Sequence, residues 1–102
     1  MSGENRVAIA GRLAGLGALR RTPAGVAVIE FRLHHESQRS EAGAQRKVNA
    51  DIDAIAFETE ARLIAAARLD HLMRVEGFLC AKNRRSRKPV LHATRIEFIE
   101  GV

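Results

Sequence analysis

The sequence predicts an all-β fold, a small barrel of five strands with one short helix. Five segments alternate apolar and polar residues with a period of two, as strands with one buried face do. A single segment has the composition of a helix. The chain has 102 residues, the usual size of one domain. We therefore expect residues 1–102 to fold as one domain.

Three strands are predicted in the first half of the chain, at residues 7–13, 26–35 and 47–57. In the second of them one face carries the apolar side chains Ala27, Ile29, Phe31 and Leu33. Proline and glycine within residues 22–25 supply the dihedral angles of a turn, which predicts a hairpin there. The polar residues 37–45 are expected to separate the second strand from the third.

The second half of the chain begins with a predicted helix at residues 58–69, which is rich in alanine, leucine, arginine and glutamate. A helix this short suits plugging one end of a barrel. Strands at 72–81 and 90–99 follow, separated by a basic run. The order of three strands, a helix and two strands is that of the OB-fold, a five-stranded Greek-key barrel.

The charge of the chain predicts a polyanionic partner. Lysine and arginine total 17 against 12 acidic residues, which gives a net charge of +5. This balance favours nucleic acid, although ribosomal and membrane-surface proteins share it. The lone Cys80 excludes an intramolecular disulfide and is expected to be a small buried side chain. With no apolar stretch of signal-peptide length at the N-terminus, a cytoplasmic location is expected.

Four stretches resemble the framework of bacterial single-stranded DNA-binding proteins: NRVAIAGRL at 5–13, RTPAG at 21–25, VIEFRL at 28–33 and VEGFL at 75–79. Within that superfamily, HES at 35–37, EAG at 41–43, Arg46 and VLHA at 90–93 are more similar to the PriB family. The resemblance implies a homodimer of OB-folds that binds single-stranded DNA and acts in the replication-restart primosome with the helicase PriA and with DnaT. It also implies a dimer interface at the first strand, near Val7 and Ile9.

The candidate DNA-contacting residues are basic. Five lie between the last two strands, in a loop that OB-folds use to contact oligonucleotides: Lys82, Arg84, Arg85, Arg87 and Lys88. We call residues 82–88 the basic loop. Three more extend the track, Arg46 and Lys47 at the start of the third strand and Arg20 in the first hairpin. For each of them, an ordinary solvated surface charge is the alternative interpretation.

Aromatic side chains, the other half of single-strand recognition, are scarce. The chain has no Trp and no Tyr, and Ala44 and Asn49 stand where the PriB family has aromatic binding residues. Alternation places Phe31 and Phe98 in the core and leaves Phe57 and Phe78 as candidate exposed rings. Binding is therefore expected to be more electrostatic and less stacked than in the family.

No catalytic or cofactor site is predicted. The four histidines lack the spacing of a metal site, and nothing accompanies Asp51 and Asp53 as an acid–base pair would require. We expect a protein that is not an enzyme. Two alternatives to a DNA-binding role stay open: an RNA-binding OB-fold, and a protein-interaction adaptor with only weak affinity for single-stranded DNA.

Overall fold

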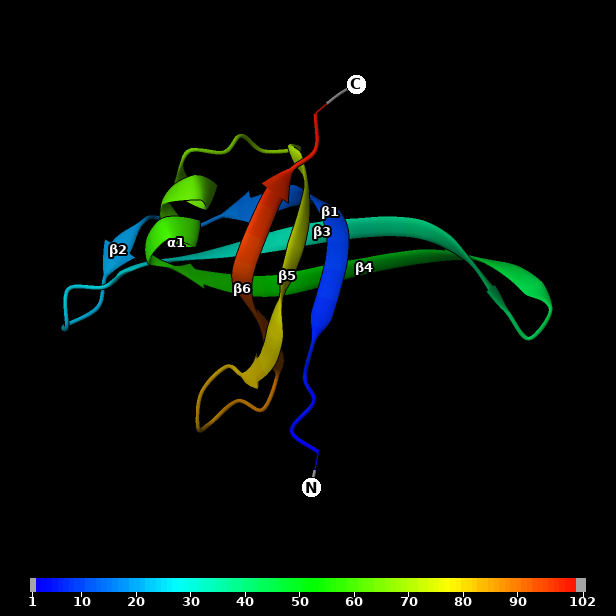
Figure 1. The fold of residues 1–102 in the computed structure, drawn as a ribbon, viewed down its shortest axis with the longest axis horizontal. Coiled ribbons are helices and arrows are strands. Elements are labelled where there is room, and N and C mark those ends of the chain that lie inside the picture. The colour runs from blue at the N-terminus through cyan, green and yellow to red at the C-terminus, as the bar shows by residue number, and fades with distance from the viewer. Residues whose placement is uncertain (1, 101–102) are drawn as a thin grey trace.

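The computed structural model describes residues 2–100, which form one closed β-barrel with a single helix (Figure 1). Its elements are β1 (Val7–Leu16), β2 (Arg20–Arg21), β3 (Ala27–Glu41), β4 (Ala44–Phe57), α1 (Glu58–Ala65), β5 (Leu72–Ala81) and β6 (Pro89–Phe98). The strands are ordered β1-β5-β6-β4-β3, and β1 pairs with β3 to close the ring. The two-residue β2 adds to β3. The predicted five-stranded OB-fold is confirmed.

The core fills the barrel with side chains from every long strand. Leu13, Leu33, Met73, Val75 and Leu91 are fully buried. They alternate with residues that are exposed or only half-buried, as the sequence pattern predicted. Because α1 covers one end of the barrel with two further buried side chains, Ala61 and Ile64, the predicted plug is confirmed. Within residues 2–100, no helix has the length and apolar character needed to cross a bilayer.

Helix α1 is shorter than predicted, ending at Ala65 instead of residue 69. The chain then turns toward β1, where the Asp70 amide donates a hydrogen bond to the Leu13 carbonyl at 2.8 Å. Asp70 adopts the left-handed φ of 70° that this turn requires. Arg68 and Leu69 are good helix formers, but the hydrogen bond of Asp70 to β1 ends the helix before them.

The start of α1 is tied to β3 through a side chain. Glu58 has a left-handed φ of 52°, and its carboxylate accepts a hydrogen bond from the Ala27 amide at 2.9 Å. That bond lowers the pKa of Glu58, with a smaller contribution from Arg62 one turn along the helix. The helix is thereby fixed against the strand whose side chains it covers.

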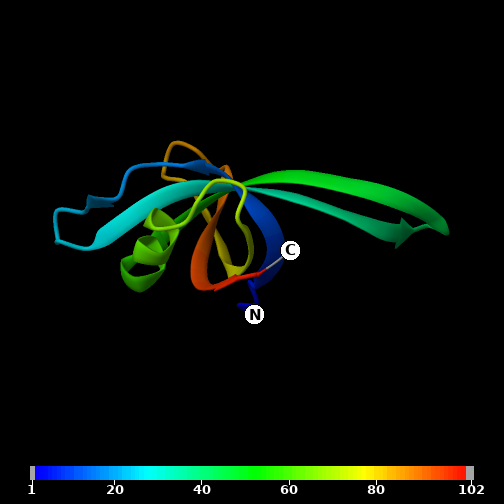
Figure 2. The same cartoon turned by 90° about the horizontal axis from the view of Figure 1, so that it is seen from above.

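The polar residues 37–45 are mostly strand, which corrects the prediction that they separate two strands. Strand β3 runs to Glu41 and β4 begins at Ala44, so that only Ala42 and Gly43 turn. Their φ angles of 52° and 81° are those of a two-residue hairpin turn with both residues left-handed. The result is a long two-stranded ribbon that reaches away from the barrel (Figures 1 and 2).

Cys80 is exposed, not buried as predicted. The last residues of β5 lie beyond the buried part of the barrel, and Leu79, next to Cys80, is 41% exposed. A register irregularity at Glu76 and Gly77 precedes this segment and shifts β5 relative to β6. Burial therefore stops before the strand does.

Candidate nucleic-acid interface

The basic loop connects β5 to β6 and is closed by its own backbone. The Lys82 amide donates to the Lys88 carbonyl at 2.9 Å. Inside the loop, the Asn83 Oδ1 atom accepts hydrogen bonds from the amides of Arg85 and Ser86 at 2.9 and 2.8 Å. Sequence reasoning overlooked Asn83, although an asparagine that bonds the backbone two residues on is a known turn signal. This turn gives a short loop a defined shape.

Four cations of this loop are exposed, and among residues 2–100 none of the four is ion-paired with a carboxylate: Lys82, Arg84, Arg85 and Arg87. They carry four positive charges within six residues. Because no carboxylate of the described chain neutralises these cations, they can contact the phosphates of a polyanion. The counterions released from the polyanion then favour binding.

Lys88, the fifth predicted cation, is held by the barrel. Its Nζ atom lies 2.7 Å from Oδ2 of Asp53 on β4. The other carboxylate oxygen, Oδ1, accepts a hydrogen bond from Arg32 Nε at 3.0 Å. These two cations, Lys88 first, lower the pKa of Asp53. Asp53 therefore anchors one end of the basic loop to β4 and partly neutralises Arg32 and Lys88.

A groove of about 400 Å³ lies beside the basic loop, between Lys82 of that loop and the C-terminal end of β1. Its lining includes Gly15, Gly17, Arg32, Asp53 and Lys82. Gly17 brings backbone close to backbone, because a Cβ atom at this position would lie 3.1 Å from the Glu30 carbonyl oxygen of β3. The floor of the groove is thus formed by small residues, and its walls carry positive charge from Arg32 and Lys82 and negative charge from Asp53.

Arg46 and Lys47 lie on the ribbon, far from the basic loop in both views (Figures 1 and 2). Arg46 faces Arg39 directly across the strand pair, a repulsive arrangement that sequence reasoning missed because it treated residue 39 as part of a connection. Arg46 Nε also lies 2.7 Å from the Glu41 carboxylate. The ribbon therefore forms a second basic region, separate from the loop.

Arg20 marks a third region, on β2. Its Nη2 atom is 3.6 Å from the Glu30 carboxylate, and both side chains are more than half exposed. A contact of that length between exposed groups contributes little to stability, so Arg20 remains available to another anion. The eight predicted residues thus occupy three places on the molecule and do not form one continuous cluster.

The phenylalanines lie where alternation predicted. Phe31 is 5% exposed, and Phe98 packs against the core. Phe57 and Phe78 are 37% and 40% exposed.

Ala44 and Asn49 are exposed on the ribbon. They present no aromatic surface there.

The neighbouring carboxylates Asp51 and Asp53 each contact a basic group. His34 Nδ1 lies 2.7 Å from Asp51, and its Nε2 lies 3.2 Å from Glu36. Both contacts raise the pKa of His34, Asp51 having the larger effect. Asp51 and Asp53 are therefore members of two separate hydrogen-bonded networks. Among residues 2–100, no group of three potential ligands is placed to hold a metal ion.

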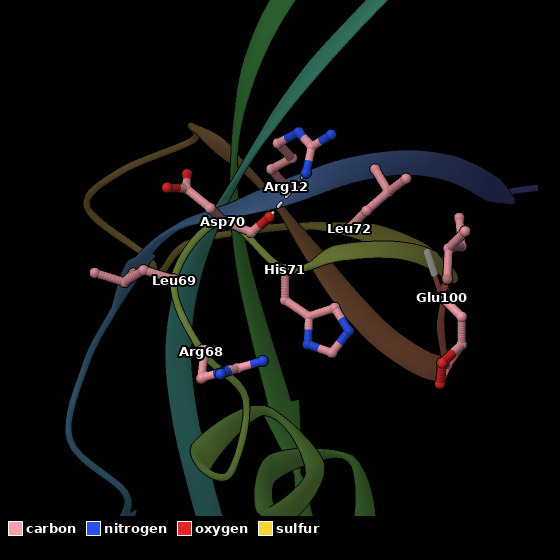
Figure 3. A pocket seen from close by; sticks show the side chains of 8 residues that line it. Arg12, Arg68, Leu69, Asp70, His71, Leu72 and Glu100 are labelled. Carbon is pink, nitrogen blue, oxygen red and sulfur yellow. Dashed lines mark hydrogen bonds between the residues drawn. The ribbon is translucent and has the colours of Figure 1, made fainter. Parts of the chain in front are cut away.

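Another hollow, of about 590 Å³, lies at the far end of β5 and β6 from the basic loop (Figure 3). Arg12, Arg68, Leu69 and His71 are among its lining residues. Arg12 is engaged there, since its Nη1 atom donates to the Asp70 carbonyl at 3.0 Å. This hollow therefore lies outside the three basic regions.

The chain is similar to known single-strand-binding proteins over nearly its whole length. A model described as another single-strand binding protein family matches residues 5–95. "Replication restart protein PriB" of Nitrosomonas europaea is 39% identical over 95 residues, covering 91% of this chain and 88% of that one. The protein of the same name from Bordetella pertussis is 38% identical over 97 residues, covering 95% and 91%.

Solved structures give the same result for the fold. The PriB structure from Ralstonia solanacearum has a TM-score of 0.85 and 26% identity, covering 96% of this chain and all of that one. The wild-type single-stranded DNA binding protein of Thermus aquaticus has a TM-score of 0.78 at 24% identity, and covers 99% of this chain and 52% of that one. The latter likeness shows the fold alone.

Proposed function

This chain belongs to the PriB family of replication restart proteins, and on that premise we propose that it binds single-stranded DNA through its basic loop and acts in the replication-restart primosome. The observation that carries the proposal is the closed loop with four exposed cations, which no carboxylate among residues 2–100 neutralises. It stands on the connection that OB-folds use for oligonucleotides, beside a groove that Lys82 helps to line.

Binding selectivity tests this proposal. The protein is titrated into labelled oligo-dT, a matched RNA and a matched duplex, and fluorescence anisotropy is followed at several salt concentrations. We expect preference for the single strand of DNA. If four phosphate contacts carry binding, log K should fall with log salt at a slope of about −3, from about −0.7 per contact. Equal affinity for all three ligands would contradict the proposal, and preference for the RNA would move the function to RNA.

The helicase PriA and the protein DnaT are proposed as partners, because the PriB family resemblance implies them. The basic loop and the ribbon are separate regions, so one of them can hold DNA while the other contacts a protein. Co-purification of the purified chain with PriA and with DnaT of the same organism measures this. Failure to capture either protein, with and without a forked DNA, would remove this part of the proposal.

We also propose a homodimer that forms through β1. On one side, residues Val7 to Arg12 pair with β5, whereas pairing with β3 on the other side begins only at Arg12. Within residues 2–100, the edge of β1 before Arg12 has no second partner strand. An open edge of this kind is a template for another strand. Light scattering is expected to give twice the 11.2 kDa mass, and a monomer at all concentrations would contradict it.

A further inference from the structure

Three aromatic rings form a stack across the outer face of the sheet. The rings of Phe78 and His92 have centroids 5.0 Å apart and are inclined by 21°. The rings of Phe57 and His92 have centroids 6.0 Å apart and are inclined by 29°. We call Phe57, His92 and Phe78 the aromatic stack. Each ring comes from a different strand, so that pairing of β6 with both β5 and β4 assembles the stack.

Strand register accounts for this arrangement. Phe78 of β5 pairs directly with His92 of β6. On the other side, His92 pairs with Ile55 of β4, two residues before Phe57 and on the same strand face. The inward neighbours on β6, Leu91 and Ala93, are buried, which places His92 on the outer face. Neighbouring strands lie about 5 Å apart, a spacing that lets rings on adjacent strands face each other.

The aromatic stack is accessible to a ligand. Phe57 and Phe78 retain 37% and 40% of their surfaces exposed. A ring that stays exposed to water forgoes the free energy that burial in the core would provide, so large apolar rings are usually buried. As the described chain leaves both end rings partly uncovered, a planar ligand can lie against either of them.

Cations stand on the same side of the sheet as the aromatic stack. Lys88, the last residue of the basic loop, precedes His92 by four residues, about 13 Å if the chain is extended there. On β4, Phe57 shares its face with Asp53, which holds Lys88 and Arg32. A chain of alternating phosphates and bases leaving the basic loop in this direction meets the rings next.

We propose that the aromatic stack is a base-stacking site for single-stranded DNA, in which Phe78 and Phe57 each receive a base while the basic loop holds the neighbouring phosphates. The inference rests on the proposed function and names a site that the charged residues alone do not indicate. It supplies the ring surface that the ribbon lacks at Ala44 and Asn49. Bases suit this surface better than an apolar peptide, because every base has a π-face and the basic loop ends only four residues before His92.

The test compares Phe78→Ala and Phe57→Ala with the unchanged protein on oligo-dT and on the same oligomer with abasic sites in place of its bases. Loss of one stacked base lowers affinity by about 5-fold to 150-fold. We expect a loss in this range on oligo-dT for each variant, with an unchanged salt slope, since no charge is removed. On the abasic oligomer the variants should bind as the unchanged protein does.

Phe78→Tyr and Leu63→Ala serve as controls. Tyrosine keeps a stacking ring and should keep the affinity, whereas Leu63 is an exposed apolar residue of α1 outside the stack. Circular dichroism and thermal unfolding establish that each variant folds. Equal affinity of a folded Phe78→Ala variant for oligo-dT, or the same loss on the abasic oligomer, would overturn the stacking site. If the unchanged protein fails to bind oligo-dT, the proposed function itself fails.

Cys80 provides a second measurement. It lies two residues from Phe78 on the same strand face, is exposed, and is the sole cysteine of the chain. Bound oligo-dT is expected to slow its alkylation by a maleimide at least about 5-fold when the DNA is saturating, in proportion to the sites covered. Unchanged alkylation by a saturated complex would show that DNA avoids this face and would overturn the inference.

Discussion

Replacing Lys82, Arg84, Arg85 and Arg87 together by alanine is expected to lower affinity for oligo-dT more than about 100-fold at 50 mM salt. The four side chains are exposed, and none is paired with a carboxylate among residues 2–100. Each substitution therefore removes one phosphate contact, together with the counterion that this contact would release from the DNA. The salt slope should become less negative by about 3, from about 0.7 for each contact. Anisotropy titrations at four or more salt concentrations measure both quantities.

Asp53→Asn is the matched control, and it is expected to change the affinity in the opposite direction. It changes one charge in nearly the same volume and releases Lys88 and Arg32 from their shared carboxylate. Affinity should rise, and the slope should steepen by up to about 1.4 if both cations reach phosphates. An unchanged slope in the four-alanine variant would contradict the phosphate role of the basic loop. A loss of affinity in Asp53→Asn would mean that anchoring the loop matters more than releasing the two cations.

Gly77→Ala is expected to lower the free energy of unfolding by at least about 3 kcal/mol. A Cβ atom at this position would overlap the carbonyl oxygen of His92 and lie 2.9 Å from its carbonyl carbon. Both atoms belong to the backbone of β6, which cannot turn aside as a flexible side chain can. For a chain of this size the melting temperature should fall by about 12–24 °C.

Gly15→Ala is the control for that substitution, because its Cβ would meet only the Cβ of Arg32 at an ordinary 3.5 Å. Thermal and urea unfolding of both variants, followed by circular dichroism, measure the difference. A Gly77→Ala protein as stable as Gly15→Ala would show that the irregularity between β5 and β6 can shift to make room.

The fold could be predicted from the chain wherever one side of a strand faces the core. Leu33 and Val75 recur at period two with other apolar residues because only one strand face reaches the interior. The ribbon escaped prediction for the same reason. Every residue from 38 to 47 is exposed, so no alternation exists there, and pairing of the two backbones decides the structure.

The candidate site divides in the same way. The sequence by itself determined the OB-fold and the position of the basic loop, because strand periodicity and a run of like charges are local properties, and its resemblance to known sequences indicated the family. Tertiary structure alone decided that Lys88 is bound to Asp53, that Cys80 is exposed, and that Phe57, His92 and Phe78 stack. The ion pair and the aromatic stack join residues far apart in the chain, which the register between paired strands brings together, and the exposure of Cys80 follows the irregularity between β5 and β6.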